Sequence, residues 1–246
     1  MREDRLDAIA AQLVAARQQG RRISLSTADW PNDFEEGFAI QERVVPALGS
    51  PIIGWKVTPV ANGPVIYAPI LAAGRVEANA TWMVTGPEPA GLELEIAFRL
   101  GRSVAAEASA AEVLEAVAAA HVVFELCQSR IADPAALPRH VALADCIANA
   151  GIVVGPEIAG WRDQDLKARP GRLLVDAMVH AEGRSLDPAA ALLLLPPAMG
   201  RRGRRIEAGQ IVITGSLIGM NWLTGRHHLK GEIEGCGEIA MNLVAA

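Results

Sequence analysis

Apolar residues in the first fifty positions recur with the period of an α-helix. In residues 3–19 they form one stripe, which consists of Leu6, Ile9, Ala10, Leu13 and Val14. A spacing of three and four residues places such side chains on one helix face, and Gly20 follows as a stop. Residues 34–48 repeat the pattern, with Phe38, Val44 and Val45 on the apolar side. We therefore expect an N-terminal helical segment over residues 1–50.

After residue 50 the chain changes to short apolar runs separated by glycine and proline, which is typical of strands. The expected strands are 52–57, 91–98, 122–127, 151–154, 173–180, 211–213, 229–234 and 238–244, with further short β segments between Pro64 and Pro87. The capping-box pattern from Ser109 to Glu112 opens an alanine-rich helix that runs on toward Val122, and Asp187-Pro188 opens another helix.

The order of these elements favours an α+β fold. Helices come first and many short strands follow, whereas a doubly wound α/β protein alternates the two strictly. We expect one globular unit whose β-rich part spans residues 51–246.

Two carboxylates stand in the apolar strand expected over residues 91–98. Glu93 and Glu95 are two residues apart in the run Leu92 to Phe98, so they project from the same face. Glu125 lies in a similar apolar run. Buried carboxylates that lie close together repel each other, and a cation with a preference for oxygen ligands relieves that repulsion. The alternative is that each glutamate pairs with a separate arginine, such as Arg99, Arg75 or Arg130.

Two further features are candidate parts of the same site. Lys56 ends the apolar strand 52–57, where it either serves as an acid or base and anion ligand, or extends its ammonium group to the solvent at a strand edge. Thr214-Gly215-Ser216 follows the strand 211–213. Its backbone N–H groups and hydroxyls suit a carboxylate, although many strand–turn units look alike.

Composition narrows the class of protein. The net charge of −5 gives no reason to expect nucleic acid, and no apolar run reaches the length needed to span a bilayer. The charged start Met1 to Arg5 does not resemble a signal peptide. We expect Cys127, Cys146 and Cys236 to pack in the core of a cytoplasmic protein, and the basic run 201–205 to form a solvated loop.

Taken together, several segments resemble the motifs of one family, in the family's order. They are Phe38-Ala39-Ile40-Gln41, Gly54-Trp55-Lys56, Leu92-Glu93-Leu94-Glu95-Ile96-Ala97-Phe98, Glu125 with Ser129-Arg130-Ile131, Asn149-Ala150 with Gly155, and Ala208 to Leu217. The chain resembles the 2-keto-4-pentenoate hydratase and 4-oxalocrotonate decarboxylase family of the fumarylacetoacetate hydrolase superfamily.

This resemblance implies a mixed β-roll with peripheral helices, and a divalent metal, Mg²⁺ or Mn²⁺, held by Glu93, Glu95 and Glu125. The substrate would be a 2-oxo or 2-hydroxydienoic acid. Lys56 would act as acid or base, and Thr214, Gly215 and Ser216 would hold the substrate. Members commonly form homo-oligomers, and a complex with a sister enzyme of the pathway is compatible with the resemblance.

The expected activity is hydration of 2-hydroxypenta-2,4-dienoate to 4-hydroxy-2-oxopentanoate in aromatic meta-cleavage catabolism. The alternatives are decarboxylation of a 2-oxo dicarboxylic acid and a weakly active paralogue that serves as an assembly partner. The chain departs from the family pattern at Gln128, Ala148 and Ala73, where family members carry acids. These departures affect the expected reaction more than the expected metal.

Overall fold

Two β-sheets enclose the main apolar core. The computed structural model describes residues 2–85 and 89–245. The larger sheet runs in the order β2 (Val65–Leu71), β1 (Ile52–Pro59), β10 (Ile211–Ile213), β5 (Ala90–Leu100), β6 (Val117–Cys127), β7 (Asn149–Glu157) and β3 (Arg75–Glu77), with β11 (Asn221–Leu223) also on β5. The smaller sheet runs in the order β4 (Thr81–Met83), β13 (Gly237–Val244), β12 (Arg226–Ile233), β8 (Pro170–Val175) and β9 (Met178–Arg184).

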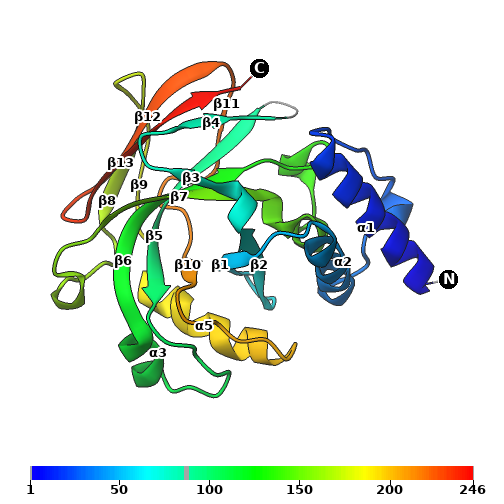
Figure 1. The fold of residues 1–246 in the computed structure, drawn as a ribbon, viewed down its shortest axis with the longest axis horizontal. Helices are drawn as coiled ribbons and strands as arrows, with labels where there is room; N and C mark the ends of the chain where they lie inside the picture. The colour runs from blue at the N-terminus through cyan, green and yellow to red at the C-terminus, as the bar shows by residue number, and fades with distance from the viewer. Residues whose placement is uncertain (1, 86–88, 246) are drawn as a thin grey trace.

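The helices lie at the periphery of the sheets (Figure 1). Helices α1 (Arg2–Gln18), α2 (Phe34–Ala47) and α4 (Arg139–Ala144) share a second apolar cluster, built on Leu6, Ile9 and Leu13 of the predicted stripe. Helices α3 (Ala110–Ala116) and α5 (Pro188–Gly200) lie along the lower side of the molecule in Figure 1. Five short 3₁₀ turns complete the described elements: η1 (Thr27–Asp29), η2 (Ala72–Gly74), η3 (Pro134–Ala136), η4 (Cys146–Ala148) and η5 (Trp161–Asp163).

The α+β class with peripheral helices is confirmed, and two predicted elements are wrong. The alanine-rich helix ends at Ala116, because the next residues pair with β5 as strand β6 and bury Ala119 and Ala120 completely. The segment 173–180 is a hairpin, because Asp176 and Ala177 both adopt positive φ angles and turn the chain between β8 and β9. Of the stretch from Pro64 to Pro87, where short β segments were expected, residues 86 and 87 lie outside the described part.

The alternation of side chains in β5 separates core from site. Leu92, Leu94, Ile96 and Phe98 enter the core between the two sheets, so Glu93 and Glu95 project from the other face of the larger sheet. None of the described helices combines the length and apolarity that a bilayer span requires.

An ion pair between Arg5 and the buried Glu36 connects the two N-terminal helices. Glu36 of α2 is 3% exposed and accepts hydrogen bonds from Arg5 of α1 and from both nitrogens of Asn32. Burial acts to raise the pKa of Glu36, but these hydrogen bonds outweigh it and lower the pKa to about 2.

We expect Glu36→Gln to lower the free energy of unfolding at pH 7 by about 1–3 kcal/mol, since a charged hydrogen-bond acceptor is lost. Because the folded-state pKa lies below the ordinary value of 4.5, the contribution of Glu36 is full above that value and is lost as the pH falls toward 2. Urea denaturation from pH 7 to 3 measures this. A difference between wild type and variant that stays constant over that range would contradict the assignment.

Candidate metal and substrate site

Five neighbouring strands of the larger sheet each contribute a group to one site. In sheet order, β1 carries Lys56, β10 leads into Thr214-Gly215-Ser216, β5 carries Glu93 and Glu95, β6 carries Glu125, and β7 begins with Asn149. Residues more than 150 positions apart therefore meet because their strands are adjacent. The sequence-predicted residues are brought together in one region.

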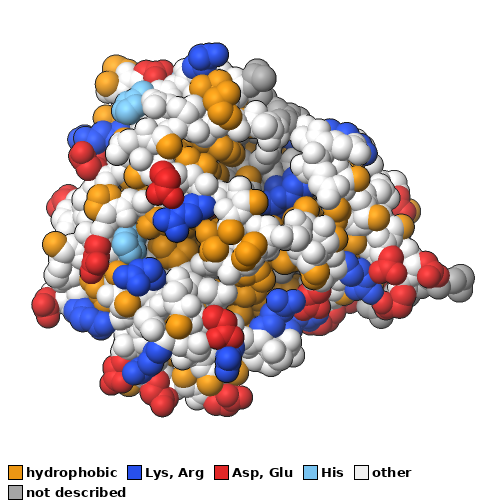
Figure 2. Space-filling view, in the orientation of Figure 1, with side chains coloured by type: hydrophobic (Ala, Val, Ile, Leu, Met, Phe, Trp, Pro, Cys, Tyr) orange, Lys and Arg blue, Asp and Glu red, His pale blue; other side chains and the backbone are white. Residues whose placement is uncertain are grey.

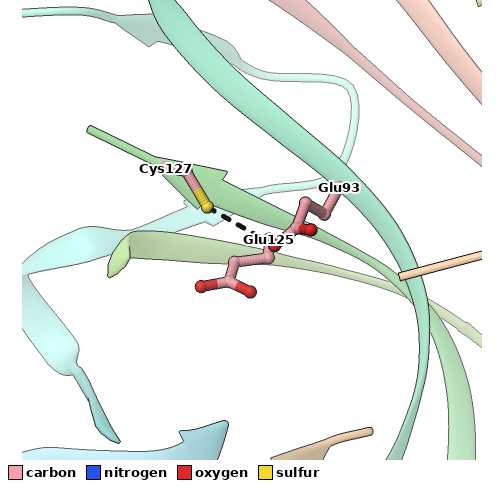
Figure 3. A group of neighbouring side chains, drawn as sticks. All are labelled: Glu93, Glu125 and Cys127. Atoms are coloured by element: carbon pink, nitrogen blue, oxygen red, sulfur yellow. Dashed lines mark hydrogen bonds between the residues drawn. The ribbon is translucent and has the colours of Figure 1, made fainter. Parts of the chain in front are cut away.

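Glu93 and Glu125 are direct cross-strand partners in the antiparallel pair of β5 and β6. Cys127, two residues beyond Glu125, opposes Gly91 on the same side. Figure 3 shows the three side chains extending from the two strands, with the Cys127 thiol directed at the Glu93 carboxylate, 3.8 Å away. One ligand atom from each residue lies within 4.8 Å of the others. The structure thus forms a compact group of potential metal ligands.

Lys56 is the counter-ion of this group. Its ammonium nitrogen is 2.7 Å from Glu125 Oε1, 3.8 Å from Glu93 Oε2 and 3.3 Å from the carbonyl oxygen of Ile147. The residue is 5% exposed, so its side chain does not extend to the solvent. Burial acts to lower the pKa of Lys56, but Glu125 and the other acids outweigh it and raise the pKa above its ordinary value. The lysine therefore stays protonated.

The alternative that each glutamate pairs with a separate arginine is wrong for Arg75 and Arg130, because both form ion pairs with other acids. Arg75 pairs with Glu77, and Arg130 pairs with Asp145. Glu93 and Glu125 share a lysine instead.

Glu95 points toward the turn that follows β10. Its Oε2 accepts a hydrogen bond of 2.7 Å from the backbone N–H of Gly215, whose φ of 110° suits glycine. The Thr214 hydroxyl donates to the carbonyl of Ile96, and the Ser216 hydroxyl donates to the carbonyl of Gly219. These donors, expected to hold the substrate, therefore serve first to fix Glu95 and the turn.

A turn with left-handed backbone conformation positions Asn149, the last side chain of the site. Cys146, Ile147 and Ala148 all have φ between 51° and 60°, a region that costs a non-glycine residue about 1–3 kcal/mol. This turn presents the carbonyl of Ile147 to Lys56 and places Asn149, whose side-chain amide donates to Glu125 Oε1 over 2.8 Å. Asn149 belongs to a motif quoted from the sequence, but its role depends on a backbone conformation that no local pattern signals.

Burial raises the pKa values of the acids. The pKa of Glu93 rises to about 7, because burial and Glu125 together outweigh Lys56. Burial and the neighbouring carboxylates raise the pKa of Glu95 well above its usual range, and burial does the same for the Cys127 thiol. Lys56 supplies one positive charge against three carboxylates, so protons or a further cation must supply the rest.

The residues present fit a divalent cation. Glu125 Oε2 and Asn149 Oδ1 are buried and have no hydrogen-bond partner in the described part of the chain. An unpartnered buried oxygen is costly, and a bound cation would satisfy that of Glu125. The oxygen donors suit a hard cation such as Mg²⁺ or Mn²⁺ better than a thiol-preferring one. Cys127 was expected only as core packing, although its position two residues beyond Glu125 places it on the same face.

A cavity of about 630 Å³ opens over this group. Lys56, Glu93 and Glu95 lie in its wall, as does the turn from Thr214 to Ser216. Apolar side chains of α5 and its approach, including Leu186, Ala190 and Leu194, form another part of the wall, and Arg139 at the start of α4 lies there as well. Of the positions where the chain departs from the family acids, Ala73 and Gln128 lie in a different cavity.

Comparisons with known proteins agree with this architecture. The chain is 27% identical over 256 residues to a 2-keto-4-pentenoate hydratase of Paraburkholderia phymatum, with 96% of this chain and 97% of the hydratase covered. No family model matches the chain. Among solved structures, 4-oxalocrotonate decarboxylase of Pseudomonas putida G7, complexed with magnesium and adipate, superposes with a TM-score of 0.87 at 19% identity, covering 99% and 98% of the two chains.

A less similar solved structure shares the fold over most of this chain. Fumarylpyruvate hydrolase of Pseudomonas aeruginosa, in complex with Mn²⁺ and pyruvate, has a TM-score of 0.61 at 15% identity over 80% of this chain and 91% of that one. The chain has the fold of the fumarylacetoacetate hydrolase superfamily. The chain is similar to a 2-keto-4-pentenoate hydratase in sequence and to a 4-oxalocrotonate decarboxylase in fold, and the resemblance stated from the sequence motifs is confirmed.

Proposed function

We propose that this protein is a divalent-metal-dependent lyase that hydrates 2-hydroxypenta-2,4-dienoate to 4-hydroxy-2-oxopentanoate. The observation that carries the proposal is the buried group of Glu93, Glu125 and Lys56 under an open cavity, with Glu125 Oε2 unpartnered in the described part of the chain. The full-length similarity to a hydratase supports the choice of reaction.

In this proposal Glu93, Glu95 and Glu125 hold Mg²⁺ or Mn²⁺. The bound ion would act as a Lewis acid that stabilises negative charge on the C2 oxygen of the substrate. Gly215 fixes the carboxylate of Glu95, and Asn149 and Lys56 fix that of Glu125. Two of the three carboxylates, those of Glu95 and Glu125, are therefore oriented before any ligand arrives.

Lys56 is the proposed proton donor to carbon. The reaction adds a hydrogen at C5 and one at C3, bonds a water oxygen to C4, and removes the hydrogen of the 2-hydroxyl, which amounts to one added water. Lys56 lies in the cavity wall, with its ammonium nitrogen 2.7 Å from Glu125 Oε1. A cation held by the same carboxylates would offset the negative charge that raises the pKa of Lys56, and would so make the ammonium group a better proton donor. The apolar wall formed by Ala190 and Leu194 suits the hydrocarbon end of the substrate.

The direct test follows the ultraviolet absorbance of freshly generated 2-hydroxypenta-2,4-dienoate with purified protein and Mg²⁺, and then with EDTA. We expect a metal-dependent loss of absorbance with 4-hydroxy-2-oxopentanoate as the product. A protein that binds Mg²⁺ and oxalate but leaves the dienoate unchanged would exclude the hydratase. It would then favour a different 2-oxo acid or the role of an assembly partner.

One observation favours decarboxylation of a 2-oxo dicarboxylic acid as a second candidate. Arg139 lines the same cavity, and no ion pair or hydrogen bond of its side chain is recorded among the described residues. A guanidinium group in that position suits a second carboxylate at the far end of a substrate. The hydratase substrate has no such group.

Replacing Arg139 with glutamine distinguishes the two reactions. If the substrate is a dicarboxylate, the variant is expected to raise its KM about tenfold or more, because a charge-assisted hydrogen bond is lost. Turnover of the monocarboxylic dienoate should not change. Steady-state kinetics of both substrates with wild type and Arg139→Gln give the answer, and an equal effect on both would remove Arg139 from substrate selection.

A further inference from the structure

A second cavity, of about 490 Å³, lies between the end of α1 and the strands β3 and β4. No described residue lines both this cavity and the one over the carboxylates. Figure 2 shows basic side chains on the surface between the strands at the left and α1 at the right. The proposed lyase reaction makes no use of this region.

The charges around this cavity are unbalanced. Arg17, Arg21 and Arg130 line it, and no aspartate or glutamate is among the described lining residues. Arg130 is satisfied, because Asp145 accepts hydrogen bonds from its backbone and side-chain nitrogens. The Arg21 side chain donates to the amide oxygen of Gln19 and to no other group within the described residues.

Arg17 is the unbalanced cation. Its side chain donates no recorded hydrogen bond and forms no ion pair within the described residues, while both oxygens of Asp145 are already bonded to Arg130. Burial and the positive charge of Arg130 lower the pKa of Arg17 to about 10. An arginine in such surroundings gains from an anion that enters the cavity.

The remaining wall indicates what kind of anion fits. Thr81, Thr85 and Ser50 supply polar groups, whereas Trp82, Met83 and Val76 supply an aromatic and aliphatic surface. Met83 is 60% exposed, so its apolar side chain is accessible to a ligand in the cavity. A simple inorganic ion would leave this apolar surface uncovered.

We propose that this cavity is a second binding site, which takes a small organic anion with its carboxylate or phosphate at Arg17 and Arg21 and its apolar body against Trp82 and Met83. The site is separate from the carboxylate cluster. It does not depend on the proposed lyase activity.

Calorimetric titration with benzoate and, separately, with inorganic phosphate tests the proposal, with EDTA present so that no metal contributes. Wild type should bind benzoate, and Arg17→Gln should bind it about tenfold or more weakly. Met83→Ser should weaken benzoate but not phosphate. Because the Arg17 side chain has no hydrogen-bond or ion-pair partner among the residues that the structure describes, Arg17→Gln should keep the wild-type unfolding transition, which circular dichroism checks.

Three outcomes would overturn the proposal. Wild type that binds neither probe excludes an anion site. Equal benzoate affinity in wild type and Arg17→Gln, with a loss in Arg139→Gln instead, assigns the binding to the other cavity. A change of oligomeric state in Arg17→Gln, measured by sedimentation velocity, shows that a second copy of the chain occupies the cavity rather than a small anion.

Discussion

Replacing Glu93 with alanine is expected to abolish Mg²⁺ binding and to reduce turnover about a thousandfold, since a metal ion contributes several kcal/mol to stabilising the charge that develops in the reaction. Glu93 is the carboxylate of the group that is nearest the solvent, with 15% of its side chain exposed. Removing the Glu93 carboxylate also removes a negative charge that repels the neighbouring Glu125. The fold should therefore persist, and the free energy of unfolding in EDTA should be unchanged or higher.

Isothermal titration with Mg²⁺ and circular dichroism measure the two halves of this prediction. Glu115→Ala is a matched control, because Glu115 is an exposed glutamate on α3 that pairs with Arg102. The control should bind Mg²⁺ as wild type does. Unchanged Mg²⁺ affinity in Glu93→Ala would show that the cation site lies elsewhere.

Replacing Lys56 with methionine is expected to lower turnover by about 10²–10⁴-fold, the usual contribution of a positioned acid or base. The same variant should lose about 3–5 kcal/mol of unfolding free energy in EDTA, because Glu125 is fully buried and loses its cation. Mg²⁺ should restore part of that stability by binding the folded state alone. The affinity of Lys56→Met for Mg²⁺ should not fall, since no proposed metal ligand has been removed.

Chemical denaturation with and without Mg²⁺, together with the dienoate assay, tests this second prediction. Lys230→Met is the control, because Lys230 lies on β12 and pairs with Glu232 and Glu238 near the surface. It should stay within about 0.5 kcal/mol of wild type. Full turnover by Lys56→Met would remove the lysine from the mechanism.

Local patterns along the chain were sufficient to predict most helices and strands and to select candidate site residues. The helical stripe of α1, the capping box at Ser109 and the proline after Asp187 are signals carried by neighbouring residues, and each marks an element in the structure. The shared face of Glu93 and Glu95 follows from the two-residue period of a strand. The resemblance of motifs strengthened the expectation of a metal and added the expected class of reaction.

Where sequence reasoning was wrong, a contact between distant residues outweighed a local preference. Alanine favours a helix, yet Ala119 and Ala120 form a strand because β5 offers hydrogen-bond partners and a buried surface. The run 173–180 reads as one strand, yet two residues in it adopt positive φ angles and reverse the chain.

The sequence by itself thus determined that this protein is an α+β protein with a strand bearing paired carboxylates, a lysine-bearing strand and a glycine turn. Only the tertiary structure decided that Glu125 faces Glu93, that Lys56 reaches Glu125 rather than the solvent, and that Asn149 supports Glu125 from a left-handed turn. The physical reason is that periodicity assigns a side chain to a face, whereas strand order and register, set by hydrogen bonds between distant segments, select its neighbours.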